Sequence, residues 1–481
     1  DLRMSRGLGD VYKRQTQSYV FQGVIDKKPP QVLKGKGCRI VVEKNGKVYE
    51  DIIDAVTGAA VGALGWGDED VAKFMLDVLP THTYTFPAII GNQNSENLAK
   101  FYIDHSPEGA FASALWCGSG SEANENAMKI IHQYWKEKGM PQKRKFISRE
   151  SSYHGFSLAA LSISENARAD EFSGILLDPS LCPKMPVCYP YRYQKEGQSE
   201  EEYTQYLLDA LEKLIIDNDP ETVASVTIET LPGSSLGTVP PPKGYLPGIR
   251  KLCDKYDVLL HLDEVMCGTG RSNPNGGLNC WENFLEPGQF PDMQSVGKTL
   301  GSGYVTIAGV LISPKVKEAY DSGSGMVMGG QTYASHGFNC GVSLKIQEKI
   351  FKKGLTKNIF EKGNMLGQKL KDAFIDKHNI VGDVRGIGGF WTCELVKDKA
   401  TKQWFDKELD IAHRCQDALF EAGLNVVGMQ GCVSNKSGEG DFVFMAPAFI
   451  ITEEDVNEIV KRFITGIEAL QEDLKTKGEW K

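Results

Sequence analysis

The chain has 481 residues, which at about 150 residues per domain suggests roughly three structural units. Hydrophobic residues make up 41% and charged residues 24%, as in globular proteins and unlike disordered ones. The 54 Lys and Arg residues against 63 Asp and Glu give a net charge of −9, which counts against nucleic acid and anionic membranes as partners. The 51 glycines exceed the average share of about 7% and suggest many tight turns or close backbone contacts with a ligand.

The eleven cysteines form no C-x-x-C pair and no Cys/His spacing typical of zinc sites. We therefore expect reduced thiols, a cytoplasmic protein and no bound metal. The longest uncharged apolar stretch, residues 55–67, is shorter than the roughly 18 residues of a membrane helix, so no membrane partner is expected. Residues 1–15 start without Met and contain no apolar segment, which predicts a non-native or disordered leader; a remnant of an organelle transit peptide is the alternative.

The elements expected in chain order alternate between strand and helix. The segment NGKVYED, within residues 35–65, predicts a turn followed by a strand. Residues 111–117 are typical of a short strand, and residues 119–135 place apolar side chains at helical spacing. Residues 223–230 predict a second strand, a helical stripe starts at Leu246, and residues 257–265 form a continuous apolar strand. Continuous apolar strands of this kind are typical of parallel sheets that are buried on both faces.

The last third of the chain has a different pattern. A long helix is expected near residues 339–353, followed by strand-like pieces at 389–396, 424–428 and 442–450 and helical patterns at 406–422 and 452–472. The predicted fold class is α/β, with a mainly parallel central sheet in a large domain, residues 81–335. A smaller α+β domain is expected to combine residues 16–80 with residues 336–481.

Three residue groups could carry chemistry. Ser119, Gly120 and Ser121 stand at the start of a predicted helix, where backbone N–H groups, hydroxyls and the helix dipole make an anion site; simple capping of the helix is the alternative. The segment is neither a P-loop nor a dinucleotide fingerprint.

Asp263 and Glu264 end a predicted parallel strand, at the edge where α/β folds bind ligands, unless they are buried acids satisfied by backbone amides or by Arg271. Lys298 lies in the glycine-rich turn GKTLGSGY. A lysine near apolar neighbours has a lowered pKa and is a candidate for a Schiff base, with an ordinary surface lysine as the alternative.

Seven short segments in a fixed order carry a resemblance to a known family: SGSEANE, SYHG, IETLPG, LDEV, GKTLGSGY, GQTY and VRGIGG. This set resembles the class III aminotransferases, from about Asn45 to the C-terminal helix. The resemblance implies fold type I among pyridoxal 5'-phosphate (PLP) enzymes, with a large cofactor domain, a small domain built from both chain ends, and a homodimer with shared active sites.

The resemblance also implies roles for individual residues. Lys298 matches the lysine that forms the Schiff base with PLP, Asp263 matches the acid that pairs with the pyridine nitrogen, and Val265 would pack on the ring. The other residues that match or extend the family pattern are Ser119, Gly120 and Ser121 for the phosphate, Tyr153 and His154 for the ring, Glu229 as a catalytic residue near the cofactor, Thr332 for the phosphate of the neighbouring subunit, Arg385 for a substrate carboxylate, and Trp66 for the substrate pocket.

The implied function is a ping-pong transfer of an amino group from an amine or ω-amino acid donor to an oxo acid. Four alternatives of the same superfamily, an aminomutase, a racemase, a lyase and a decarboxylase, stay open, as does a catalytically silent binding protein. A nicotinamide-dependent dehydrogenase is disfavoured because the dinucleotide fingerprint is missing. The chain departs from the family pattern at Thr306, Gln331 and Gly337, which bears on the substrate class more than on the chemistry.

Overall fold

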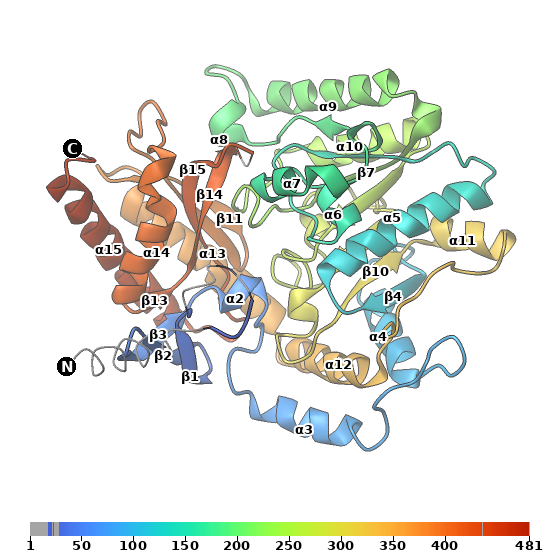
Figure 1. The fold of residues 1–481 in the computed structure, drawn as a ribbon, viewed down its shortest axis with the longest axis horizontal. Helices are drawn as coiled ribbons and strands as arrows, with labels where there is room; N and C mark the ends of the chain where they lie inside the picture. The colour runs from blue at the N-terminus through green and yellow to red at the C-terminus, as the bar shows by residue number, and fades with distance from the viewer. Residues whose placement is uncertain (1–17, 22, 24–27, 435, 481) are drawn as a thin grey trace, which may run out of the picture.

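The structure is a computed structural model, and it describes residues 18–21, 23, 28–434 and 436–480. The leader expected at residues 1–15 lies outside the described residues. Three β-sheets organise this part of the chain: one of seven strands and two of four strands each (Figure 1).

The seven-stranded sheet has the order β4-β10-β9-β8-β7-β5-β6. Its strands are β4 (Ser113–Cys117), β5 (Lys145–Arg149), β6 (Lys184–Met185), β7 (Val223–Glu229), β8 (Leu259–Asp263), β9 (Met293–Val296) and β10 (Ala308–Ile312). The strands from β6 to β9 pair in parallel, whereas β10 runs antiparallel to both β4 and β9. The expectation of a mainly parallel sheet is therefore confirmed, with one antiparallel strand that was not predicted.

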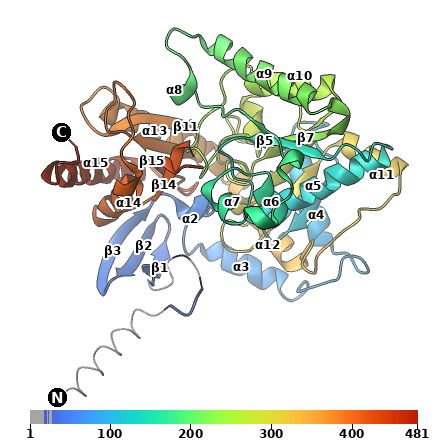
Figure 2. The same ribbon diagram turned by 45° about the horizontal axis from the view of Figure 1, so that its top comes forward.

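Helices cover both faces of this sheet, as Figures 1 and 2 show. Side chains alternate between the faces along a strand. Ala224 of β7 packs with α5 (Gly120–Glu137) and α11 (Pro314–Ser322) on one face. Its direct neighbour Val223 packs with α4 (Gln93–Asp104), α9 (Glu200–Asp217) and α10 (Tyr245–Lys255) on the other face. This burial on both sides explains why the strand sequences are largely apolar.

The two ends of the chain meet in the four-stranded sheets. Strands β1 (Gln31–Lys36), β2 (Arg39–Lys44) and β3 (Lys47–Asp54) form an antiparallel meander, and β13 (Leu424–Asn425) adds to β3 in parallel, with Leu424 opposite Ile53. The third sheet has the order β11-β12-β15-β14, from β11 (Val381–Ile387), β12 (Phe390–Leu395), β14 (Val427–Ser434) and β15 (Glu439–Met445). In Figure 1 the blue N-terminal strands and the red C-terminal elements accordingly lie side by side.

The helices near the C-terminus pack on these smaller sheets or beside the large one. They are α12 (Gly337–Lys352), α13 (Leu355–Phe374), α14 (Ile411–Glu421) and α15 (Glu453–Thr476). The predicted helices at 339–353, 406–422 and 452–472 match α12, α14 and α15, whereas α13, α9, α4 and α3 (Glu69–Val78) were not predicted. Within the described part of the chain, none of the helices combines the length and the apolar character that crossing a bilayer requires.

Candidate active site

The carboxyl ends of three neighbouring strands bring the predicted catalytic residues together. Glu229 and Asp263 are the last residues of β7 and β8 and stand opposite each other in the parallel register. Lys298 follows the end of β9 after Gly297. A cavity of about 140 Å³ opens at this edge, and its lining comprises Gly120, Ser121, Asn124, Tyr153, His154, Gly155, Glu229, Leu231, Ser234, Asp263, Val265, Met266 and Lys298.

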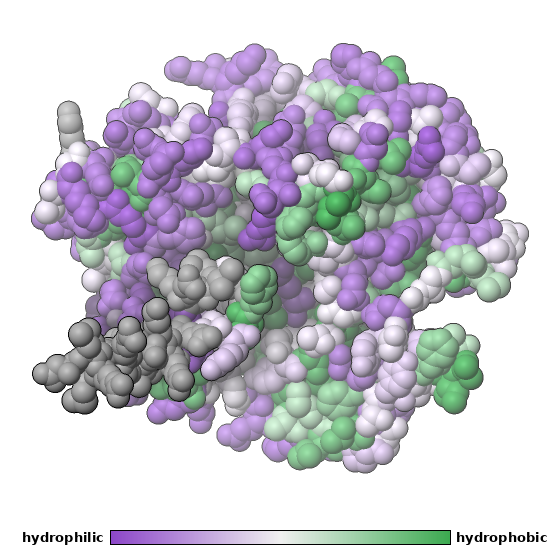
Figure 3. Space-filling model, viewed as in Figure 1, coloured by the Kyte–Doolittle hydropathy of each residue, from purple (hydrophilic) through white to green (hydrophobic). Residues whose placement is uncertain are grey.

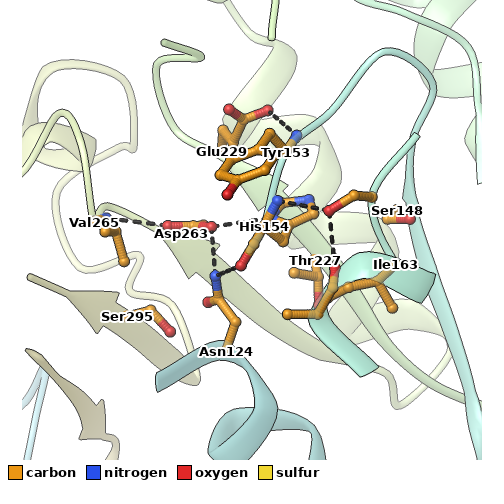
Figure 4. Close-up of polar contacts among 12 residues, drawn as sticks. Asn124, Ser148, Tyr153, His154, Ile163, Thr227, Glu229, Asp263, Val265 and Ser295 are labelled. Carbon is orange, nitrogen blue, oxygen red and sulfur yellow. Dashed lines mark hydrogen bonds and ion pairs between the residues drawn. The ribbon is translucent and has the colours of Figure 1, made fainter. Parts of the chain in front are cut away.

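Asp263 is buried and held by three hydrogen-bond donors (Figure 4). The amide of Val265 donates to Oδ1 at 3.0 Å, and Asn124 Nδ2 and His154 Nδ1 donate to Oδ2 at 2.8 and 2.9 Å. Burial alone would raise the pKa of Asp263, but the contacts with His154 and the Val265 amide outweigh burial and lower it. Asp263 is therefore a carboxylate anion at the floor of the cavity.

Lys298 brings a primary amine to the same cavity. Its backbone is in the left-handed region, with φ of +47°, an unfavourable conformation that non-glycine residues adopt mostly where the surrounding structure enforces it. Burial is the main cause that lowers the pKa of the Lys298 amine, although the nearby Asp263 and Glu229 act in the opposite direction. The amine consequently loses its proton more readily than an ordinary lysine does.

The start of α5 forms another wall. Ser119 caps this helix, and its Oγ accepts the amide of Glu122 at 3.2 Å, so the capping role proposed as an alternative is present. A Cβ atom on Gly120 would approach Val265 Cγ1 to 2.6 Å, so only glycine fits beneath that side chain. Ser121 Oγ accepts the amide of Phe156 at 2.9 Å and keeps its own hydrogen for a ligand. Free amides and the helix dipole at this wall favour an anion.

Glu229 is neutralised within the protein. Arg149 Nη2, at the end of β5, lies 3.1 Å from Glu229 Oε2, and both side chains are buried. Ser235 Oγ bonds both carboxylate oxygens at 3.0 Å, and the amide of Tyr153 lies 3.4 Å from Oε2. Burial raises the pKa of Glu229, and the charge of Arg149 opposes that shift. Glu229 thereby fixes the segment that carries Tyr153 and His154.

Glu264, the other acid of the strand end, faces the core instead. Its carboxylate accepts the amides of Cys280 and Trp281 at 2.7 Å and Gln294 Nε2 at 3.1 Å, and burial raises its pKa to about 8. Glu264 is thus the buried acid satisfied by backbone amides that the sequence left open as an alternative. Arg271 pairs with neither acid, because its Nη1 donates to the carbonyls of Gly389 and Pro447.

Arg385 does not line the cavity. Its Nε and Nη2 donate to the carbonyls of Gly237 and Leu236, both at 2.7 Å, and its Nη1 contacts Glu394 at 2.7 Å and Asp383 at 3.0 Å. Four of the five N–H donors of a guanidinium are occupied by these contacts. In this arrangement Arg385 joins β11 to β12 and to the loop after β7, and it has little capacity left for a substrate carboxylate.

Replacing Arg385 by leucine is therefore expected to cost about 3 kcal/mol of stability, because it removes one of the two arginines that pair with the buried Glu394, the other being Arg192. The KM for oxo acids should change less than twofold. Urea unfolding and steady-state kinetics measure the two effects. Arg39→Leu, which breaks the exposed pair with Asp51, is the control and should cost less than about 1 kcal/mol. A tenfold rise of KM with unchanged stability would instead assign Arg385 to the substrate.

Two further predicted residues lie away from the cavity. Trp66 Nε1 donates to Asp54 Oδ2 at 2.7 Å, and its ring lines a separate pocket of about 280 Å³ together with Tyr304. Thr332 is exposed and lines a larger hollow of about 880 Å³, on the loop that leads to α12. Its neighbour Gln331 bonds Glu122 Oε2 at 3.0 Å, which ties this loop to the start of α5.

Sequence reasoning missed two residues of the site. Asn124 contacts Asp263, and Arg149 neutralises Glu229. Asn124 lies one helical turn after Gly120 and belongs to the SGSEANE segment itself, so the helical period could have pointed to it. Arg149 has no comparable signal. Nothing in the local sequence distinguishes an arginine that pairs with a neighbouring strand from any other arginine at the end of a strand.

Comparison with known proteins assigns the family. Residues 25–467 match the model of the class III aminotransferases. An aminotransferase of Gibberella zeae is 38% identical, with 90% of this chain and 83% of the relative covered. The diaminobutyrate–2-oxoglutarate transaminase of Halomonas elongata is 32% identical, with 92% and 91% covered. The chain therefore belongs to the class III aminotransferases.

Solved structures agree with this assignment. The ω-transaminase of Pseudomonas jessenii in complex with PMP superimposes with a TM-score of 0.86 at 28% identity, with 97% of this chain and 98% of that chain covered. A transaminase from Virgibacillus gives a TM-score of 0.85 at 26% identity, with 97% and 100% covered. The expected fold type I is confirmed, and the chain is a PLP-dependent aminotransferase.

The cavity has the groups that this cofactor requires. The bare helix start at Gly120 suits a phosphate, the Asp263 carboxylate suits a protonated pyridine nitrogen, and the Lys298 amine suits a carbonyl. Asn124 Oδ1 is buried, lines the cavity and has no hydrogen-bond partner among the described residues, as expected where a ligand completes a site. The residues present thus fit PLP.

Proposed function

We propose that this enzyme transfers the terminal amino group of an amine or ω-amino acid to an oxo acid, with Lys298 and Asp263 as its catalytic residues. One observation carries the proposal: the Lys298 amine, the Asp263 carboxylate and the N-terminus of α5 line the same cavity. No second function is favoured by any particular contact.

In the proposed site, one group of residues binds the phosphate of PLP and another contacts its ring. Gly120 and Ser121, with Ser119 capping the helix, hold the phosphate through amides, a hydroxyl and the helix dipole. Val265 and Tyr153 flank the ring. PLP, when bound, supplies the electron sink that stabilises negative charge on the donor carbon.

Lys298 is the residue that we propose to transfer the proton of the donor carbon. Because burial lowers the pKa of its amine, the neutral form is available to accept a proton from the donor carbon and to return it. Asp263 keeps a proton on the pyridine nitrogen, since an adjacent anion favours the charged form of a base. Glu229 orients the segment of Tyr153 and His154 from behind, through its pair with Arg149.

The donor class is inferred from relatives. The matching proteins include a diaminobutyrate transaminase, a γ-aminobutyrate transaminase of Solanum lycopersicum and a putrescine–pyruvate aminotransferase of Pseudomonas aeruginosa. The donors that these names state carry a terminal amine. Because Arg385 is paired with Glu394 and is not free to bind a carboxylate, the site also suits a donor that has no α-carboxylate.

A donor screen tests the proposal. The purified protein is incubated with putrescine, γ-aminobutyrate or diaminobutyrate together with pyruvate or 2-oxoglutarate, or with L-alanine together with 2-oxoglutarate, and the aminated acceptor is quantified. Transfer from a terminal amine is the expected result. A racemase, lyase, decarboxylase or aminomutase gives no aminated acceptor, and that outcome would reject the proposal.

We also propose a homodimer that forms through an exposed apolar face, residues 76–90 and 326–333. Figure 3 shows apolar surface over α3 and the loop after it, at the lower edge of the view. Tyr84 and Tyr333 link the two segments, with ring centroids 5.9 Å apart. The exposed large apolar side chains of this face are Leu76, Leu79, Tyr84, Phe86, Ile89, Ile90, Met326, Val327, Met328 and Tyr333. Contiguous patches of this kind favour burial against a partner. Thr332, on the same face, would then reach the phosphate of the neighbouring subunit.

An aspartate at Ile89 is expected to weaken this dimer at least tenfold, because a charge would be buried in an apolar contact. Sedimentation velocity over a concentration series measures the dissociation constant. Ile216→Asp is the matched control, since Ile216 is an exposed isoleucine on α9, outside the apolar face. A dimer that Ile89→Asp leaves intact would place the interface elsewhere.

The division of the chain and its location in the cell complete the proposal. We propose domains at residues 16–80 with 336–481, and 81–335, supported by the pairing of β3 with β13. A cytoplasmic location is supported by the eleven cysteines, all of which are free and buried. Limited proteolysis near residues 80 and 335 and cell fractionation test these two points.

A further inference from the structure

Two side chains that do not belong to the strand edge determine the surroundings of Asp263. Oδ2 accepts Asn124 Nδ2 at 2.8 Å and His154 Nδ1 at 2.9 Å, and only Oδ1 is held by the local amide of Val265. An ionised carboxylate is purely an acceptor, so the Nδ1 atom of His154 must carry a hydrogen. Both donors therefore prefer the charged form of Asp263 over its protonated form.

Asn124 also links the two other residues of this cluster. Besides its bond to Asp263, its Nδ2 donates to the carbonyl of His154 at 2.5 Å. Both amide hydrogens are then used, which fixes the rotation of the side chain. His154 is held again through its own amide, which donates to Ser164 Oγ at 2.8 Å. Figure 4 shows Asn124, His154 and Asp263 converging in this way.

The other charged and titratable groups around Asp263 do not replace these donors. His261 lies on the same strand, and burial lowers its pKa to about 4, so that it is neutral at pH 7. It bonds Ser295 Oγ at 2.8 Å. Glu229, on β7, is paired with Arg149. Lys298, after β9, interacts with Asp263 only through its charge.

We propose that Asn124 and His154 are positioning residues that keep Asp263 ionised and aimed into the cavity, and thereby keep the ring nitrogen of the bound cofactor protonated. This inference rests on the proposed function. Without the two donors, Asp263 would bind a proton more tightly, and within the pair it would hold a larger share of the proton that otherwise stays on the ring nitrogen. Each lost bond to a charged acceptor corresponds to about a tenfold change in how this proton divides between Asp263 and the ring nitrogen.

The test follows the ring nitrogen directly. Protein is loaded with pyridoxamine 5'-phosphate labelled with ¹⁵N in the ring, and the ¹⁵N chemical shift is recorded against pH. Asn124→Leu removes one donor with little change in volume, and His154→Leu removes the other. His154→Asn is the conservative variant, because its amide N–H can stand where Nδ1 stands. Asn126→Leu is the matched control on the same helix, since Asn126 does not contact Asp263.

At a pH where the unchanged protein holds the ring nitrogen protonated, the expected result is a ¹⁵N chemical shift displaced towards that of the unprotonated ring in Asn124→Leu and in His154→Leu, because the proton divides about tenfold more in favour of Asp263 in each. His154→Asn and Asn126→Leu should give the chemical shift of the unchanged protein. Cofactor uptake by the variants shows that they fold, and either leucine variant alone is sufficient for the comparison. Uptake with an unchanged ¹⁵N chemical shift of the ring in both leucine variants would overturn this inference and leave the proposed function intact. Failure of the unchanged protein to take up the cofactor would overturn both.

Discussion

Replacing Lys298 by alanine is expected to lower kcat for amino transfer by about 10³-fold or more, because the variant has no group to accept and return the proton of the donor carbon. Covalent attachment of PLP, measured as borohydride-stable labelling of the peptide that contains residue 298, should disappear. Lys317→Ala is the control, since Lys317 is exposed on α11 and, among the residues that the structure describes, pairs with Asp321 alone. It should react like the unchanged enzyme.

Persistence of the covalent label in the Lys298→Ala variant would assign attachment to another amine. Lys184 is the first such candidate, because burial lowers its pKa to about 8. Its amine, however, donates to Ser148 Oγ and to the carbonyl of Ile163, both at 2.7 Å, and Lys184 does not line the cavity. Lys298 is therefore the amine that the geometry favours for this reaction.

The second large effect is expected for Asp263→Asn. Asparagine keeps the shape of the side chain and removes the charge, so the pyridine nitrogen loses the anion that favours its protonation. We expect kcat to fall by about 10²- to 10³-fold, the range seen when one electrostatic contact to a developing charge is removed. Cofactor uptake should remain measurable, because the proposed phosphate site at Gly120 is unchanged.

Asp292→Asn is the matched control for this experiment. Asp292 is as buried as Asp263, but it pairs with Arg250 at 2.7 Å and precedes β9 at the opposite edge of the sheet. Its replacement should lower the unfolding midpoint and leave the kcat of the folded enzyme within about threefold of the original. Equal kcat values in both variants would remove Asp263 from the chemistry.

The elements that could be predicted best are those whose type is shown by the local order of apolar and polar residues along the chain. Strands β7 and β8 are short and mostly apolar, and α5 has apolar residues at helical spacing, so their types and approximate bounds could be predicted from the local sequence. The helix α13, by contrast, follows α12 after a very short connection, and its cap is Gly354 in the left-handed conformation. In the sequence, a glycine between two helical segments is equally typical of the residue that ends the first helix and of the residue that begins the second.

The candidate site divides in a similar way. Asp263 ends a buried strand and Lys298 comes two residues after another. Because parallel strands have their carboxyl ends at one edge of the sheet, these two residues could be expected to meet. The environment of Arg385 could not, because Glu394 lies on the paired strand β12 and Gly237 lies in a loop about 150 residues earlier in the chain. Partners that are remote in sequence leave no local pattern, and a motif match says nothing about which contacts occupy a side chain.

One helix supplies contacts at both ends of the proposed cofactor site. Gly120 begins α5, where we propose that the phosphate binds, and Asn124, four residues later, holds the Asp263 carboxylate. Four residues of α-helix rise about 6 Å, and a packed helix neither stretches nor shortens by much. Rigid backbone thus sets the spacing between the proposed phosphate site and the Asp263 carboxylate. A phosphate ester whose aromatic nitrogen lies further away, such as a flavin mononucleotide, could satisfy one end of this site but not both.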